Sequence, residues 1–285
     1  MGQGGQVFGG QTGLIGGRRG AANVAKRTPM PDWDARQYLK FEDERTRPPR
    51  DLLAQVPLSR ARLVIDLGCG PGNSTELLVA RYPDAEVIGV DSSVNMLRQA
   101  RARLPRRTFI QANIASWTPE EPADLLFSNS AFQWAPRQQN VLLRLVQTLP
   151  QGGVLAVQIP DIGEIPALVL LREVAGRGPW ARNPAVAEAA RRDVPKPETY
   201  YDLLRPMCGH VDIWHTIYSH VLAGPEAIVE WLKGSALQPF LSALEPQMID
   251  DFLAVYTDQI DRHHSKRIDG QVLLKLPRLF IVATQ

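Results

Sequence analysis

The sequence predicts an α/β protein: a doubly wound sheet of seven strands with helices on both faces and a helical cap. The first observation is that short apolar runs alternate with helical patterns from residue 62 to residue 160, which is typical of a parallel sheet. The second is a glycine-rich turn directly after the first apolar run, at Gly68, Gly70 and Gly72. The third is a mainly helical stretch after residue 160, where the alternation weakens. We expect that stretch to form the cap.

The first five expected strands are short apolar runs bounded by turn signals. They span residues 63–66, 87–91, 108–111, 124–128 and 154–159. Helical patterns over 74–81, 93–104 and 138–149 lie between them. Asn73 and Ser74 are expected to cap the first of these helices, because their side chains can accept hydrogen bonds from its free N–H groups. Gly152 and Gly153 turn the chain into the fifth strand.

The second half of the chain is expected to add two strands and the helical cap. A helix is predicted over 165–175, followed by a Gly-, Pro- and Arg-rich loop over 176–197. Residues 212–220 alternate in polarity as a half-buried strand does, and 276–284 is the last apolar run. Helical patterns between these two strands occupy 225–233, 237–244 and 246–262. Together with residues 32–55, they are expected to cover the tips of the strands.

Composition excludes several classes of protein. The net charge is +2, with 32 basic and 30 acidic residues among 285, so no nucleic-acid footprint is visible. The chain has two cysteines, Cys69 and Cys208, which predicts a reducing, cytoplasmic location rather than a disulfide scaffold. No apolar run approaches the ~20 residues of a membrane span, and no signal peptide is recognisable. We therefore expect a small-molecule partner, with no nucleic acid and no membrane.

The glycine turn and the next strand predict a nucleotide-type site. Glycines at 68, 70 and 72 allow the backbone to approach a ligand that any Cβ would push away. Asp91 ends the second expected strand, where a carboxylate can accept hydrogen bonds from ribose hydroxyls. We expect this pair of features to bind a cofactor that contains adenosine.

The pattern Asp66-x-Gly68-x-Gly70-Pro71-Gly72 resembles the first motif of the class I S-adenosylmethionine-dependent methyltransferases, which have a Rossmann-like fold. The resemblance implies that the loop wraps the methionine part of the cofactor. It also implies that Asp66 acts on the cofactor's amino group, directly or through water. A sulfonium cofactor has no phosphate, and the loop accordingly carries no lysine.

Further distinctive segments lie at 38–48, 66–75, 132–134, 153–161, 211–216 and 276–280. They narrow the resemblance to the trans-aconitate 2-methyltransferases, over nearly the whole chain from residue 32. The resemblance implies methyl transfer from S-adenosylmethionine to a carboxylate of the tricarboxylate trans-aconitate, giving a monomethyl ester and S-adenosylhomocysteine. Two positions depart from the family pattern: Asn113 stands where an aspartate is usual, and Arg137-Gln138 where an acid and a histidine are usual.

The expected domain organisation follows from these assignments. Residues 1–29 are glycine-rich and nearly free of large apolar groups, so we expect a disordered extension. Residues 30–285 are expected to form a single methyltransferase domain. Within it we assign 32–55 to N-terminal cap helices, 61–160 to the cofactor-binding half, and 161–285 to the substrate half with its helical insertion 225–262. The oligomeric state is left open.

A carboxylate substrate changes what catalysis requires. A carboxyl group with a pKa near 4 is already ionised at pH 7 and needs no general base. Positioning of oxygen, methyl and sulfur can contribute ~7–11 kcal/mol to such a step. We therefore expect no catalytic histidine or cysteine. Positioning is assigned to Asn129, Ser130 and Trp134, and Arg side chains are expected to grip the other carboxylates.

The resemblance carries over to individual residues of this chain. For Arg45 and Arg47, the alternative to ligand binding is a position on a solvent-exposed helix face. For Trp134, the alternative is a structural role in the hydrophobic core. The cofactor contacts are assigned to Tyr38, Arg45, Asp66, Gly68, Gly70, Pro71, Gly72, Asp91, Ser92, Met96, Asn113, Ile114 and Asn129. The substrate contacts are assigned to Phe41, Arg47, Trp134, Trp180, Tyr200, Tyr201 and Arg278.

Histidine spacing does not predict a metal site. His210, His215 and His220 are five residues apart, so neighbours lie on opposite faces of a strand and do not converge. His263 and His264 end an expected helix, where cations complement the dipole.

Two functional alternatives stay open at this point. One is a methyltransferase that acts on another small carboxylic acid, and the other is a non-catalytic S-adenosylmethionine-binding regulatory protein. A nucleic-acid methyltransferase is disfavoured, because no Pro-Pro-aromatic platform follows the fourth strand and no cysteine follows a proline.

Overall fold

The structure is a computed structural model that describes residue 1 and residues 35–190 and 195–285, without the side chains of Ala35 and Tyr38. Every element below lies within Pro31–Gln285. The expected extension 1–29 lies outside the described residues, apart from Met1.

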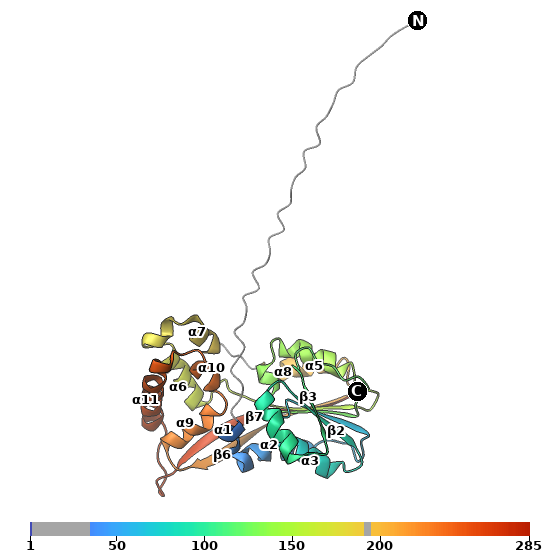
Figure 1. Cartoon of the computed structure of the whole chain (residues 1–285), viewed down its shortest axis with the longest axis horizontal. Helices are drawn as coiled ribbons and strands as arrows, with labels where there is room; N and C mark the ends of the chain where they lie inside the picture. Colours follow the sequence, from blue (N-terminus) through green and yellow to red (C-terminus); the bar gives the residue numbers. More distant parts are fainter. Residues whose placement is uncertain (2–34, 191–194) are drawn as a thin grey trace. The chain divides into compact units, whose positions relative to one another are not determined.

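The seven-stranded sheet predicted from the sequence is confirmed, and its order is β3-β2-β1-β4-β5-β7-β6 (Figure 1). The first five strands are parallel, whereas β7 runs antiparallel to both β5 and β6. The strand order reverses between β1 and β4, which is the place where doubly wound sheets bind ligands. The strands are β1 Leu63–Leu67, β2 Glu86–Asp91, β3 Thr108–Gln111, β4 Leu125–Asn129, β5 Val154–Pro160, β6 His210–Leu222 and β7 Val272–Thr284.

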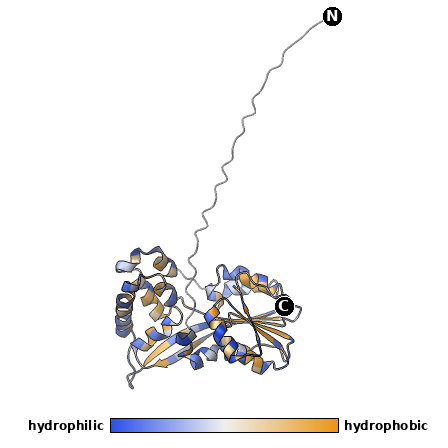
Figure 2. Ribbon diagram, viewed as in Figure 1, coloured by the Kyte–Doolittle hydropathy of each residue, from blue (hydrophilic) through white to orange (hydrophobic). Residues whose placement is uncertain are grey.

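Helices cover both faces of the sheet because successive strand residues are buried on alternate sides. One face packs Val64, Phe127 and Ala156 against α2 and α3. The other face packs Ile65 and Leu126 against α5 and α8, and Figure 2 shows apolar residues along most of the sheet strands. The helices of this layer are α2 Glu42–Ala54, α3 Asn73–Arg81, α4 Val94–Arg103, α5 Gln138–Val146 and α8 Pro197–Leu204, with the 3-10 turn η1 Phe132–Trp134.

The cap has a hydrophobic core of its own. Trp180, Trp231 and Phe252 pack there against Leu274 and other apolar residues at the far end of the β6–β7 hairpin. The hairpin pairs thirteen residues on each strand, so it extends beyond the rest of the sheet and carries the cap (Figure 1). The elements outside the sheet layer are α1 Ala35–Leu39, α6 Pro166–Ala175, η2 Pro179–Arg182, α7 Pro184–Ala190, α9 Pro225–Lys233, α10 Gln238–Leu241 and α11 Pro246–His263.

The prediction of a loop over 176–197 is wrong for most of that range. It contains η2 and α7, and α8 begins at its last residue. Pro179, Pro184 and Pro197 each start a helical segment. A proline suits the first helical position because its missing N–H would have no partner there. The residues that suggested loop structure are therefore helix starts.

Candidate functional site

The glycine loop between β1 and α3 has the left-handed backbone that its composition predicts. Gly68, Gly70 and Gly72 have φ values of 72°, 54° and 91°. A Cβ at Gly68 would lie 2.2 Å from the Cβ of Ala131, and a Cβ at Gly72 would crowd Ala100 on α4. At Gly70, by contrast, the same Cβ would meet nothing within 4 Å among the described residues. The first and third glycines thus fit the loop into the fold, and the middle one faces open space.

Asp66 is a fully buried carboxylate beneath this loop. Its Oδ2 accepts hydrogen bonds from Ser74 Oγ at 2.8 Å and Thr75 Oγ1 at 2.7 Å. Its Oδ1 has no hydrogen-bond partner among the described residues. Burial raises the pKa of Asp66 to about 6, and the two hydroxyls oppose part of that rise. An unpaired buried carboxylate oxygen is costly, so this atom fits the amino group of a bound ligand.

The predicted cap of α3 is corrected by the same contacts. Gly72 occupies the N-cap position, and no side chain caps the helix. Ser74 donates to Asp66 instead, and Asn73 Nδ2 donates to Thr46 Oγ1 on α2 at 3.2 Å. These side chains fix Asp66 and the neighbouring helix, and the first N–H groups of α3 are left without a side-chain cap.

Asp91 at the end of β2 holds the loop in place. Its Oδ2 accepts from the Gly70 N–H at 2.9 Å, and its Oδ1 accepts from the Ser93 N–H at 2.8 Å. The carboxylate thus orders the backbone at the tip of β2, where the ribose contact is predicted.

Four of the predicted cofactor contacts, which we expect to border the adenine, lie on segments that follow β2 and β3. Met96 is buried at the start of α4, and its N–H donates a hydrogen bond to Ser93 Oγ. Ser92 is exposed. Asn113 is exposed as well, and its Oδ1 already accepts from the Ala115 N–H at 2.9 Å. That turn uses one lone pair of the amide oxygen, and the other can still accept a hydrogen bond from a ligand. The assignment of Asn113 and its neighbour Ile114 stays a prediction.

The end of β4 gathers polar groups whose partners come from later strands. Asn129 is buried, and its Oδ1 has no partner among the described residues. Ser130 has φ 57°, which is uncommon for a residue with a side chain. Its Oγ donates to Gln158 Oε1 at 2.8 Å and accepts from Arg278 Nη1 at 3.1 Å. The structure thus brings Arg278 to the residues expected to face the methyl group.

Strand register places the polar residues on one face of the sheet. Asp66 is paired with Phe127, Asn129 with Gln158, and Gln158 with Phe280. Because side chains alternate along a strand, Arg278 and the β6 residues Tyr218 and His220 lie on this face too. We call this set the polar track; it consists of Asp66, Asn129, Gln158, Arg278, Tyr218 and His220. Sequence analysis did not identify Gln158, Tyr218 or His220 as site residues.

The N-terminal cap places two arginines over the hairpin end of the polar track. Arg45 is buried, and its Nη2 donates to the Trp231 carbonyl at 3.0 Å, with Cζ 5.0 Å from the Trp231 ring centroid. Arg47 is exposed, and its Cζ lies 5.2 Å from the centroid of the Tyr218 ring. Tyr218 donates in turn to Asp51 Oδ2 at 2.6 Å. The alternative that Arg45 lies on a solvent-exposed helix face is therefore wrong.

Several predicted substrate contacts lie in packed surroundings instead. Trp180 is in the cap core, where its Nε1 donates to the Val174 carbonyl at 2.7 Å. Tyr200 is buried on the sheet face opposite the polar track and donates to Gln138 Oε1. Phe41 packs on Trp231 with ring centroids 4.7 Å apart. Tyr201 is exposed on α8 and Trp134 is half-buried in η1, whereas the Tyr38 side chain lies outside the described residues.

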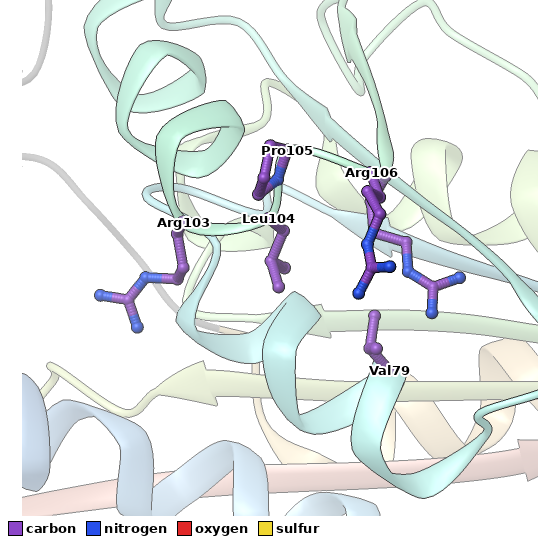
Figure 3. A pocket seen from close by; sticks show the side chains of 6 residues that line it. Val79, Arg103, Leu104, Pro105 and Arg106 are labelled. Atoms are coloured by element: carbon purple, nitrogen blue, oxygen red, sulfur yellow. The ribbon is translucent and has the colours of Figure 1, made fainter.

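A basic surface hollow lies at a different place, where the end of α4 meets α3 (Figure 3). It is lined by Val79 and by residues 103–107. Arg103 there forms ion pairs with Glu42 and Glu76. None of the assigned site residues lines this hollow, so we do not include it in the site.

Across residues 35–190 and 195–285, no group of three or more His, Cys, Asp and Glu side chains is arranged to hold a metal ion. Within the same residues, no helix combines the length and apolar character that crossing a membrane requires.

Comparisons with known proteins define the class. A family model described as "Methyltransferase domain" matches residues 64–153. A putative methyltransferase from an antibiotic biosynthesis pathway of Anabaena variabilis aligns with a TM-score of 0.57 and 17% identity, over 84% of this chain and 97% of that one. Phosphoethanolamine N-methyltransferase 2 of Haemonchus contortus, solved with S-adenosylmethionine, gives 0.53 and 16%, over 88% and 56%. The chain has the fold and glycine loop of a class I S-adenosylmethionine-dependent methyltransferase.

Closer relatives narrow the class to a family. A trans-aconitate 2-methyltransferase of Rhodopseudomonas palustris (strain BisB18) is 56% identical over 254 residues, which cover 89% of this chain and 99% of the relative. One of Afipia carboxidovorans is 54% identical over 256 residues, with coverages of 90% and 100%. The chain belongs to the trans-aconitate 2-methyltransferase family.

Proposed function

We propose that the protein transfers a methyl group from S-adenosylmethionine to a carboxylate of trans-aconitate, with the monomethyl ester and S-adenosylhomocysteine as products. The supporting structural observation is the hydrogen bond from Arg278 to Ser130 Oγ. It places a guanidinium next to the residues at the end of β4. A fixed cation there suits an anionic acceptor and would be unfavourable beside the cationic amine of an N-methyltransferase substrate.

The cofactor supplies an activated methyl group on a sulfonium. For its binding we assign the unpartnered Oδ1 of Asp66 to the amino group and the open space at Gly70 to the methionine part. Asp91 is assigned to the ribose hydroxyls. Asn129 is assigned to the junction with the substrate, where its buried Oδ1 can accept a hydrogen bond.

The chain's residues then need to bind, orient and exclude water. The acceptor carboxylate is ionised at neutral pH, so no residue has to remove a proton from it. Arg278 and Arg47 are assigned to the carboxylates that are not methylated, and their contacts fix the attacking oxygen in line with the methyl group. The positioning role assigned to Ser130 is supported by its two hydrogen bonds, which join it to Arg278 and Gln158.

The decisive experiment is a methyl-transfer screen with S-adenosylmethionine labelled in its methyl group. Purified protein is incubated with trans-aconitate, with other di- and tricarboxylic acids, and with a fatty acid. We expect label in a product of trans-aconitate, and mild alkali should release it as methanol, because esters hydrolyse where ethers and methylamines do not.

Each other outcome has a definite meaning. A stronger reaction with a different acid would replace trans-aconitate as substrate. Cofactor binding without turnover of any acid would contradict an enzymatic role and favour the regulatory alternative. An alkali-stable product would contradict carboxylate methylation. We also infer a cytoplasmic location, supported by the free, buried state of Cys69 and Cys208.

A further inference from the structure

His220 is a buried polar residue on the polar track, and sequence analysis gave it no role. Its residue is 6% exposed, and its Nε2 has no hydrogen-bond partner among the described residues. The ring lies between two aromatic rings, with centroids 4.4 Å from Trp231 and 6.3 Å from Tyr218. A buried ring nitrogen without a partner is unfavourable, and it indicates a group that a ligand completes.

The charges around His220 indicate what that ligand carries. The guanidinium groups of Arg278, Arg47 and Arg45 lie close enough to His220 to disfavour its protonated form. The nearby carboxylate of Asp51 already accepts a hydrogen bond from Tyr218. Burial first, and then these three arginines, lower the pKa of His220 to about 4. The ring is therefore neutral at pH 7, and one of its nitrogens carries a proton that it can donate.

Three cations and one neutral donor make this end of the polar track suitable for a carboxylate. Arg278 connects the two ends, because it donates to Ser130 and also lies close enough to affect His220. An acid that reaches from Ser130 toward His220 would thus present one carboxylate at each end. A dicarboxylate that lacks the distal group would leave the His220 nitrogen unsatisfied.

We propose that His220 is a specificity-determining residue whose Nε2–H donates a hydrogen bond to the substrate carboxylate farthest from the methylated one. This inference rests on the proposed function, since it assigns a role within that site. His220 acts in this role as a neutral donor, and it neither receives a proton nor touches the methyl group. Selection for a tricarboxylate follows, because a substrate without the third carboxylate cannot make this bond.

The test compares His220→Leu with His220→Gln. Gln keeps an N–H donor and cannot act as a base, whereas Leu fills the space without any donor. For trans-aconitate, we expect His220→Leu to raise KM by about 10- to 100-fold, as for the loss of a hydrogen bond to a charged group. We expect kcat to stay within about threefold. His220→Gln should restore KM to within about fivefold of wild type.

A second substrate and a matched control separate specificity from structure. Mesaconate has a methyl group in place of the CH2-carboxylate arm of trans-aconitate, the arm that the proposal places at His220, so His220→Leu should leave its KM unchanged. His215→Leu alters a histidine of the same strand that is exposed on the other face and pairs with Asp161, and it should leave both substrates unaffected. Equal losses for both acids, or weaker binding of S-adenosylhomocysteine, would show a structural role for His220 and overturn the proposal.

Calorimetry measures substrate binding without methyl transfer, so it tests the role of His220 independently of the reaction. Trans-aconitate is titrated into protein saturated with S-adenosylhomocysteine, and we expect His220→Leu to weaken binding by the same factor as it raises KM. Binding without methylation would contradict the proposed function, while the His220→Leu data would still decide the role of His220. No binding of trans-aconitate by wild type would overturn both. Loss of kcat in both His220 variants would indicate a base and also overturn the donor role.

Discussion

At the scale of single residues, Asp66 shows how a buried carboxylate can keep one oxygen available for a ligand. The carboxylate is fully buried, and one of its oxygens is satisfied by Ser74 and Thr75. Its pKa lies at about 6 in the folded protein, against an ordinary value of 3.8. The folded state therefore holds this proton more tightly than the unfolded state. By linkage, the contribution of Asp66 to stability is present below about pH 4 and is lost as the pH rises toward 6.

The first prediction concerns the pH dependence of cofactor binding. The amino group of the cofactor is a cation, so it binds the ionised form of Asp66. Affinity for S-adenosylhomocysteine should thus be constant above pH 6 and fall by up to about tenfold per pH unit below it. Calorimetric titrations from pH 5 to pH 7.5 measure this. Asp66→Asn should bind weakly at every pH, and an affinity of wild type that does not change across pH 6 would contradict the assignment.

Residues that depend on local pattern could be predicted from the sequence. The glycine motif and the acid at the end of β2 are close in sequence, so their proximity could be predicted, and a hydrogen bond joins Gly70 to Asp91. Their roles in cofactor binding stay predictions. The Asn73–Ser74 cap was wrong because the buried Asp66 competes for the Ser74 hydroxyl. Gln158 and His220 could not be found, because their neighbours come from strands far along the chain.

At the scale of elements, a glycine in the loop can be needed for its backbone conformation, for space beside the ligand, or for both. Gly70 and Gly152 share two properties: each has a positive φ, 54° and 79°, and a Cβ at either would meet nothing within 4 Å among the described residues. They differ in place, because Gly152 lies in the turn before β5, away from the loop. The two glycines are therefore a matched pair.

The second prediction uses this pair. Gly70→Ala and Gly152→Ala should each destabilise the protein by about 1–2 kcal/mol, the usual cost of a left-handed conformation for a residue with a Cβ. Only Gly70→Ala should weaken binding of S-adenosylmethionine, by more than about tenfold, because its methyl group enters the space assigned to the ligand. Thermal unfolding and calorimetry measure the two effects. Equal affinity in both variants would show that the space at Gly70 is not the cofactor site.

The elements of the cap were predicted less well than those of the sheet. Strands alternating with helices have a clear period, and every predicted strand is present within two residues at its start except the last, which begins four residues earlier, at Val272. Pro184 and Pro197 suggested a loop, but each begins a helix that packing stabilises: Val186 is buried in the cap core, and Leu204 on the sheet. Proline marks both loops and helix starts, so only tertiary contacts decide between them.

At the scale of the whole molecule, the long hairpin unites the two hydrophobic cores. Its β7 strand pairs with β5 near Ser130, and its far end carries Leu274 and Leu276 into the cap core. Arg278 lies between these ends, and His220 is paired with Leu274 at the far end, on the same face. Helix α2 packs on this region and contributes Arg45, which contacts Trp231, and Arg47, which contacts Tyr218. The substrate end of the site thus depends on antiparallel register that sequence periodicity does not reveal.

The third prediction concerns catalysis by the molecule as a whole. The chain contains five histidines, and a carboxylate acceptor requires none of them as a base. Replacing His210, His215, His263 or His264 with glutamine should leave kcat for methyl transfer within about threefold of wild type. Steady-state assays with saturating trans-aconitate measure this. A loss of about 100-fold or more in any variant would contradict catalysis without a general base.

The most direct test of the account is a calorimetric titration of S-adenosylmethionine into wild-type protein and Asp91→Ala. The carboxylate of Asp91 orders the loop through the Gly70 N–H and is assigned to the ribose. We predict one binding site per chain for wild type and no measurable binding for Asp91→Ala, while Asp84→Ala, at an exposed position, binds as wild type does. Unchanged affinity in a folded Asp91→Ala variant would contradict the claim that this loop and this acid hold the methyl donor.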